Sequence, residues 1–121
     1  MFWVRLGSLF MFLAVALGAF GAHALRHRLS SDLLQVFESG VRYHFYHALA
    51  LFVVAWISKS YPSGLVTAAG WAFTVGVILF SGSLYVLSVT GARWLGAVTP
   101  AGGLAFLAGW ILLALASFRV S

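Results

Sequence analysis

Cysteine is absent from this chain of 121 residues, and acidic side chains are almost absent. Without cysteine there are no disulfides, thiolate metal sites or cysteine nucleophiles, and the redox compartment is left open. The only acidic residues are Asp32 and Glu38, which excludes a paired-carboxylate site within the apolar segments. No nucleophile elbow or phosphate-binding loop is present either. The sequence therefore predicts a protein that is not an enzyme.

Charged residues of either sign are also scarce. They make up 7% of the chain, and 63% of its residues are hydrophobic, against about a quarter and about half in ordinary soluble domains. A soluble domain of this size buries only about two-thirds of its surface, so this composition would leave large apolar patches in water. It predicts a protein embedded in a lipid bilayer. No charge run or proline-rich tract divides the chain, which predicts one domain over residues 1–121.

The basic residues outnumber the acidic ones, for a net charge of +5, but they are scattered singly along the chain. A nucleic-acid surface needs clustered basic residues, so the pattern argues against a nucleic-acid partner. Single Arg and Lys residues between apolar runs are typical of helix ends anchored among lipid head groups.

Four apolar runs predict four membrane-spanning helices, at residues 6–25, 41–58, 65–90 and 100–118. Each is close to the roughly 20 residues that cross the hydrocarbon core as an α-helix. A tight turn at 61–64 separates the second and third spans, and Thr99-Pro100 is a helix-start signal for the fourth. The first run also resembles a cleaved signal peptide, although it is long for one. We therefore expect an all-α membrane protein built as a four-helix bundle.

The segment between the first two spans holds most of the charge and has apolar residues at helical spacing. Leu33 and Phe37 fall on one face and Gln35 on another. This pattern predicts a short amphipathic helix over residues 31–39, lying at the membrane surface. Gly40 would then mark a bend where the chain enters the membrane.

Three of the predicted spans carry small residues at four-residue spacing, in stripes that include Gly18, Gly76 and Gly109. In lipid no hydrophobic force pulls apolar helices together, so close contact along small faces is a main source of association. We expect each of these glycines to lie at a helix crossing. A stripe left unpaired within the bundle would serve self-association.

Polar residues of all four spans fall toward one side of the membrane, because the loops after the first and third spans lie on the same side. These residues are His23, Tyr43, His47, Ser81, Ser83, Tyr85 and Thr99. Polar groups inside lipid are costly and face a bundle interior or a water-filled cavity. These residues have two interpretations. They form a shared polar pocket, or their rings lie at the membrane interface and their hydroxyls bond the backbone of their own helix, with no pocket. In a shared pocket, His23 and His47 face each other across the bundle, with Tyr85 nearby.

The histidines also have spacings that could bring imidazoles together on one helix face. His44 and His47 are three residues apart, and His23 and His27 are four apart. Metal sites in proteins usually add cysteine or carboxylate ligands, and none lies in a matching position within the spans. We therefore expect neither a metal nor another cofactor.

Four strings, taken in order, resemble one known family over nearly the whole chain. They are "GAFGAHAL" at 18–25, "YHFYHALAL" at 43–51, "LFSGSLYVLSVTG" at 79–91 and "LGAVTPAGGLAFLAGW" at 95–110. In these the chain is similar to the small bacterial membrane proteins called domain of unknown function 423. The resemblance implies a four-span protein of the bacterial inner membrane with no assigned activity. By position it singles out His23, Tyr43, His47, Ser81, Gly82, Ser83, Tyr85, Thr99, Pro100 and Gly103, and it leaves out His27 and His44.

Two hypotheses for the function are consistent with these features. In the first, the protein is a structural or accessory membrane component that self-associates or supports a larger complex, and its polar groups join helix to helix. In the second, it binds or conducts a lipid, quinone, small solute or proton through a polar pocket. The spans lack the acidic residues that relay protons or bind sodium, which favours the first. The numbers of basic residues on the two sides of the membrane are nearly equal, so they barely constrain the orientation. Similar sequences carry more basic residues in the second loop and the C-terminal tail, and basic segments usually lie in the cytoplasm, which favours cytoplasmic termini.

Overall fold

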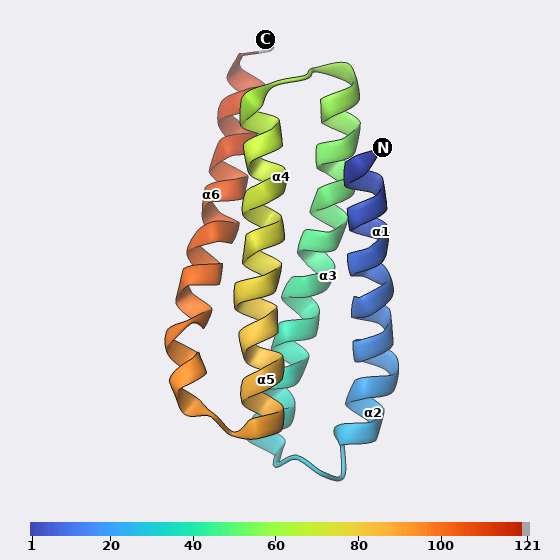
Figure 1. Ribbon diagram of the computed structural model, residues 1–121, viewed down its shortest axis with the longest axis vertical. Coiled ribbons are helices and arrows are strands. Elements are labelled where there is room, and N and C mark those ends of the chain that lie inside the picture. Colours follow the sequence, from blue (N-terminus) through green and yellow to red (C-terminus); the bar gives the residue numbers. More distant parts are fainter. Residues whose placement is uncertain (120–121) are drawn as a thin grey trace.

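The computed structural model describes residues 1–119, and within this range every regular element is a helix. The elements are α1 (Phe2–Val15), η1 (Ala16–Gly21), α2 (Ala22–Leu25), α3 (Ser31–Ser60), α4 (Gly64–Gly76), η2 (Val77–Ser81), α5 (Gly82–Thr90), η3 (Arg93–Ala97) and α6 (Thr99–Phe118). Here η1 and η2 are π-helical turns and η3 is a 3₁₀ helix. They join into four long rods, and the start of α1 and the end of α6 lie at the same end of the bundle (Figure 1). The predicted four-helix architecture is confirmed.

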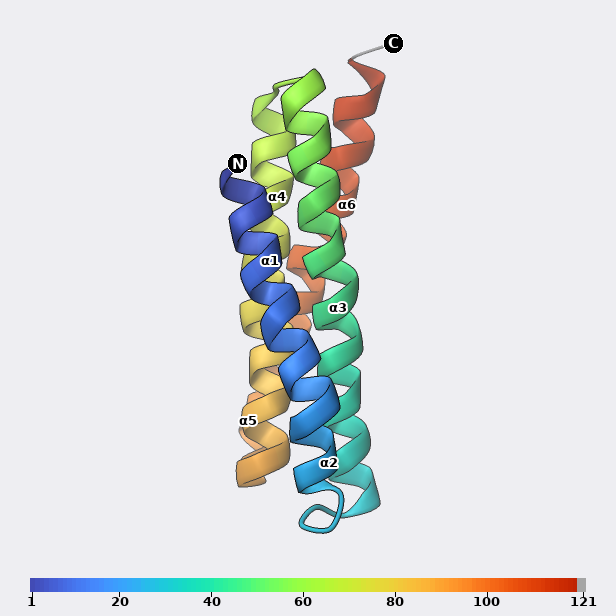
Figure 2. The same cartoon turned by 90° about the vertical axis from the view of Figure 1, so that its right-hand side faces the viewer.

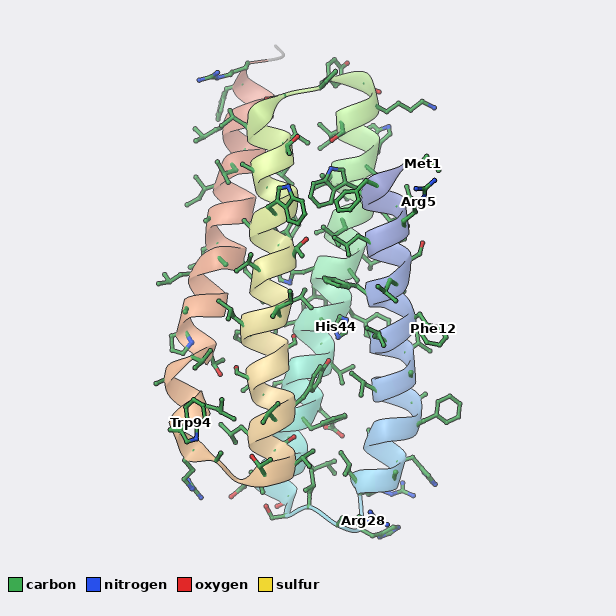
Figure 3. All side chains as sticks on the ribbon, viewed as in Figure 1. Met1, Arg5, Phe12, Arg28, His44 and Trp94 are labelled. Atoms are coloured by element: carbon green, nitrogen blue, oxygen red, sulfur yellow. The ribbon has the colours of Figure 1, made fainter. Side chains whose placement is uncertain are left out.

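Three of the rods are long and apolar enough to cross a bilayer. They are Phe2–Leu25, Gly64–Thr90 and Arg93–Phe118, of 24, 27 and 26 residues. They contain the spans predicted at 6–25, 65–90 and 100–118. At 1.5 Å per residue each exceeds the roughly 30 Å of hydrocarbon. Large apolar side chains point outward: Phe12 is 69% exposed and is directed away from the bundle in Figure 3.

The remaining rod, α3, is one continuous helix of 30 residues from Ser31 to Ser60. This is about 45 Å of helix, more than a bilayer crossing needs. The segment 31–39 is helical as predicted, but it is the first part of this rod and not a separate surface helix. The expected bend at Gly40 is absent, and the helix continues through this residue. The glycine instead gives room to a neighbouring helix, since a Cβ there would lie 2.9 Å from the Tyr85 ring.

The first turns of α3 keep the predicted amphipathic pattern. Ser30 caps the helix start, where its Oγ accepts a hydrogen bond from the Leu33 N–H at 3.3 Å. Gln35 is exposed, whereas Phe37 is buried with its ring centre 5.2 Å from that of Tyr85. The apolar face of this segment therefore packs on α5.

The centre of the bundle is formed by α3 and the α4–η2–α5 rod. α1 packs on α3, α6 packs on α4 and η2, and α5 packs on α3. Figures 1 and 2 show α1 and α6 on opposite sides of the central pair. Leu51 and Val54 of α3 meet Val66 and Phe73 of α4 in the core, and all four side chains are fully buried. This apolar core holds α3 in the register that places its polar residues.

Glycines lie where helices approach most closely. The three glycines predicted at crossings each face a side chain of another helix: Gly18 faces Val41, Gly76 faces Phe106 and Gly109 faces Phe73. A further close approach occurs at Gly102, where a Cβ would overlap the backbone of Phe80 in η2. In a bundle held by van der Waals contact, these positions decide how near the rods can come.

Candidate functional site

His44 lies inside the bundle on α3, with only 4% of its surface exposed. Its Nδ1 is 2.8 Å from the hydroxyl of Tyr85 in α5, and its ring meets the Phe10 ring of α1 edge-on at 5.9 Å between centres. Figure 3 shows His44 on the side of α3 that faces α1. Its Nε2 is buried and has no hydrogen-bond partner among residues 1–119. His44 therefore joins three rods at one point.

His47 faces a different neighbour, α6. Its ring stacks on that of Phe106, with centres 3.6 Å apart and planes 8° apart. Its Nδ1 is 2.8 Å from the Tyr43 carbonyl, and the indole N–H of Trp110 donates to its Nε2 at 3.1 Å. A carbonyl only accepts and an indole only donates, so Nδ1 carries the proton and Nε2 carries none. The two partners thus fix a neutral imidazole in one tautomer.

Two hydroxyl contacts also join rods: one is a second contact between α3 and the α4–η2–α5 rod, and the other joins that rod to α6. Ser81 is fully buried in η2, and its hydroxyl donates to the Gly40 carbonyl of α3 at 2.7 Å. The hydroxyl oxygens of Ser83 in α5 and Thr99 in α6 are 2.6 Å apart. Buried hydroxyls cost free energy when unpaired, so each contact favours one register between its two helices. We refer to the side chains that make these contacts as the polar layer, which comprises His44, His47, Ser81, Ser83, Tyr85, Thr99 and Trp110.

The structure corrects the expected pairing of His23 with His47. His23 lies in α2 and is exposed, whereas His47 is buried against α6. The expectation assumed a regular α-helix, but the π-helical turn η1 adds a residue to one turn and rotates the rest of the rod by about 100°. The Tyr43 side chain is also outside the interior, because it is 40% exposed. Tyr43 contacts the polar layer through its backbone carbonyl, which accepts a hydrogen bond from His47.

His44 was missed, although the sequence contains a signal that would have found it. Phe37, Val41, His44, Ala48 and Leu51 are separated by alternating spacings of four and three residues, and all are buried in α3. A stripe with this period is the core-facing side of a helix. A polar residue within such a stripe must find a partner inside the bundle, and Tyr85 is that partner.

The contacts of the polar layer join one helix to another. His44 contacts Tyr85 and Phe10, whereas His47 contacts Phe106 and Trp110. Within residues 1–119, no three His, Asp or Glu side chains gather as metal ligands. Five surface grooves of residues 1–119 are lined by residues outside the polar layer. His44, His47, Ser81 and Ser83 each have a hydrogen-bond partner on a neighbouring rod.

Replacing Tyr85 by phenylalanine tests the contact between α3 and α5. The substitution removes the hydroxyl that pairs with His44 and leaves a buried imidazole without that partner. We expect the free energy of unfolding to fall by about 1–3 kcal/mol, measured by thermal denaturation in detergent. Tyr61→Phe is the control, because Tyr61 is 52% exposed. Equal stability of the two variants would show that the pair does not hold α3 to α5.

Helical rods with outward apolar side chains and a self-paired polar interior define a small multi-pass membrane protein. The chain belongs to the bacterial family described as protein of unknown function DUF423, whose family model matches residues 17–103. The resemblance seen in the sequence is thus confirmed.

Its relatives support the same membership across nearly the whole chain. It is 50% identical over 117 residues to the UPF0382 membrane protein YwdK of Bacillus subtilis, covering 96% of this chain and 95% of the relative. It is 46% identical over 116 residues to the UPF0382 membrane protein SH2409 of Staphylococcus haemolyticus, covering 96% and 94%. No solved structure matches the chain. The names of the relatives confirm the predicted lipid environment.

Proposed function

We propose that this protein is a non-catalytic structural or accessory component of the bacterial inner membrane. The observation that supports this most is that the polar layer pairs with itself from helix to helix. His44 pairs with Tyr85, His47 with Trp110, and Ser81 with the backbone of α3. Such contacts fix the positions of the rods, as a scaffold for other membrane proteins requires.

The alternative function, binding or conduction of a quinone, small solute or proton, would need polar groups open to a cavity. His44, His47 and Ser81 are buried, and they contact other helices. Conduction also requires groups that exchange partners easily, whereas His47 is held on both ring nitrogens. We therefore place the function of the polar layer in packing.

The proposed role includes association with other proteins, either copies of this chain or subunits of a larger complex. α1 and α6 pack on the central pair from one side each, so both keep a broad apolar face for lipid or other helices. Native mass spectrometry of the full chain released in mild detergent tests this. We expect masses of discrete multimers or of complexes with other membrane proteins. A lone chain under all conditions would contradict the accessory role.

We further propose that both termini face the cytoplasm. The start of the first helix and the end of the last helix lie at the same side of the bundle (Figure 1). The side of the membrane assigned to one terminus therefore also applies to the other. A reporter active only in the cytoplasm, fused to either end, tests the orientation. Activity of both fusions is the expected result, and inactivity of both would reverse the assignment.

A flux measurement separates a structural role from conduction. Vesicles that hold a pH-sensitive dye are reconstituted with the protein, and an acid pulse is applied outside. Because His44, His47 and Ser81 are buried and contact other helices, we expect the pH gradient to decay as slowly as in protein-free vesicles. Vesicles with the Tyr85→Phe variant are the matched control. A decay that is faster with the wild-type protein than with this variant would favour conduction through the polar layer.

A further inference from the structure

A groove of about 450 Å³ lies between the start of α1 and the last turns of α3. Its lining includes Val4 of α1 and Phe52, Ala55, Ser58 and Lys59 of α3. The volume is within the roughly 300–1,000 Å³ of pockets that hold ligands. From Phe52 to Lys59 the wall runs about 10 Å along the helix axis, a large part of one leaflet of about 15 Å. The groove therefore extends from the end of the bundle into the depth of acyl chains.

The walls of this groove are apolar and its mouth is polar. Val4, Phe52 and Ala55 supply apolar surface, while the exposed Lys59 stands in the last turn of α3. Ser58 lies in the wall of the groove, and its hydroxyl oxygen is buried without a hydrogen-bond partner among residues 1–119. An unpaired hydroxyl in apolar surroundings is unfavourable.

The mouth of the groove is also positively charged. Arg5 is exposed in the first turns of α1, and Figure 3 shows it beside Met1, which lines the groove. The only acidic residues of the chain, Asp32 and Glu38, lie in the first turns of α3, at the other end of that helix. No acidic side chain therefore compensates Lys59 and Arg5, and the groove mouth attracts an anion.

We propose that this groove binds an anionic glycerophospholipid of the bilayer. The apolar walls hold one acyl chain, and Lys59 and Arg5 hold the phosphate. A lipid fits the apolar walls and the cationic mouth together, since it is the membrane component that joins an apolar chain to a phosphate at this depth. Net negative charge distinguishes the ligand from zwitterionic lipids, whose own ammonium group competes with Lys59 and Arg5 for the phosphate.

Lipid titration of the full-length protein in mild detergent tests the proposal. Phosphatidylglycerol and phosphatidylcholine with identical acyl chains are compared, with lipid adducts counted by native mass spectrometry and melting temperatures by tryptophan fluorescence. We expect phosphatidylglycerol to bind more tightly, and the preference to fall roughly fivefold for each of Lys59→Gln and Arg5→Gln. Arg119→Gln is the charge-matched control, because Arg119 lies at the same end and outside the groove. Equal binding of both lipids, or an equal loss with Arg119→Gln, overturns the proposal.

A second pair of variants tests the groove itself without changing charge. Ala55→Leu fills the groove with a larger side chain, and Ala68→Leu makes the same change on an exposed face of α4. We expect Ala55→Leu to reduce phosphatidylglycerol adducts and Ala68→Leu to leave them unchanged. Full retention of adducts by a folded Ala55→Leu variant overturns the groove as the site. Neither outcome bears on the polar layer, which lies outside this groove.

Discussion

The Gly102→Ala variant should lose a large part of the stability of the bundle. A Cβ at this position would overlap the backbone of Phe80 in η2, and a backbone cannot move aside as a flexible side chain does. The rods α6 and η2 would have to separate, which also disturbs the packing around Phe106. Overpacking typically costs about 1–3 kcal/mol, and we expect the upper end of this range or more. Thermal denaturation in detergent, followed by circular dichroism, measures the loss.

The neighbouring glycine provides the control for this prediction. A Cβ at Gly103 would meet only the Phe80 ring, at 3.9 Å, which is an ordinary contact distance. Alanine is also the better helix former, by about 1 kcal/mol. We therefore expect Gly103→Ala to be neutral or slightly stabilising. If the two variants melt together, close approach at Gly102 is not the feature that holds α6 to η2.

The His47→Ala variant should be the most damaging single change in the polar layer. It removes the ring that stacks on Phe106 and the acceptor of the Trp110 N–H. The cavity and the buried indole N–H left without a partner each contribute, and together we expect a loss of about 3 kcal/mol or more. The change in Trp110 surroundings should also shift the tryptophan emission of the protein.

His23→Ala is the matched control, because it makes the same substitution in an exposed histidine. We expect its melting temperature to equal that of the wild-type protein. The comparison also distinguishes an arrangement in which His23 faces His47 inside the bundle from one in which His23 is exposed and His47 packs on α6. A loss of stability in His23→Ala as large as that in His47→Ala would restore the shared site that the structure argues against.

The spans at residues 6–25, 65–90 and 100–118 could be predicted from the sequence because they depend on composition. Lipid requires about 20 apolar residues in each crossing helix, and charged residues mark the ends. The same reasoning placed His47, Ser81 and Tyr85 at the polar side of the bundle, and the structure brings them into the interior. These properties depend on the local sequence and need no knowledge of the neighbouring helix.

The direction of each side chain could not be predicted in the same way. His23 was expected to face inward on a regular helix, and η1 changes its direction. Gly40 was expected to bend α3, whereas it makes room for Tyr85. Gly102 has no feature in its local sequence that sets it apart from Gly103. Each of these outcomes depends on which helix lies opposite, and that is decided by packing across the whole bundle.

The π-helical turn η2 allows one rod to serve two neighbours in succession. In a regular α-helix the buried stripe continues along one side, so the partner of the first half is also the partner of the second. The additional residue in η2 starts a new stripe. The rod accordingly packs chiefly on α6 along α4, and on α3 along α5. A short chain thereby gains a larger number of distinct helix interfaces than its few crossings of the membrane would otherwise provide.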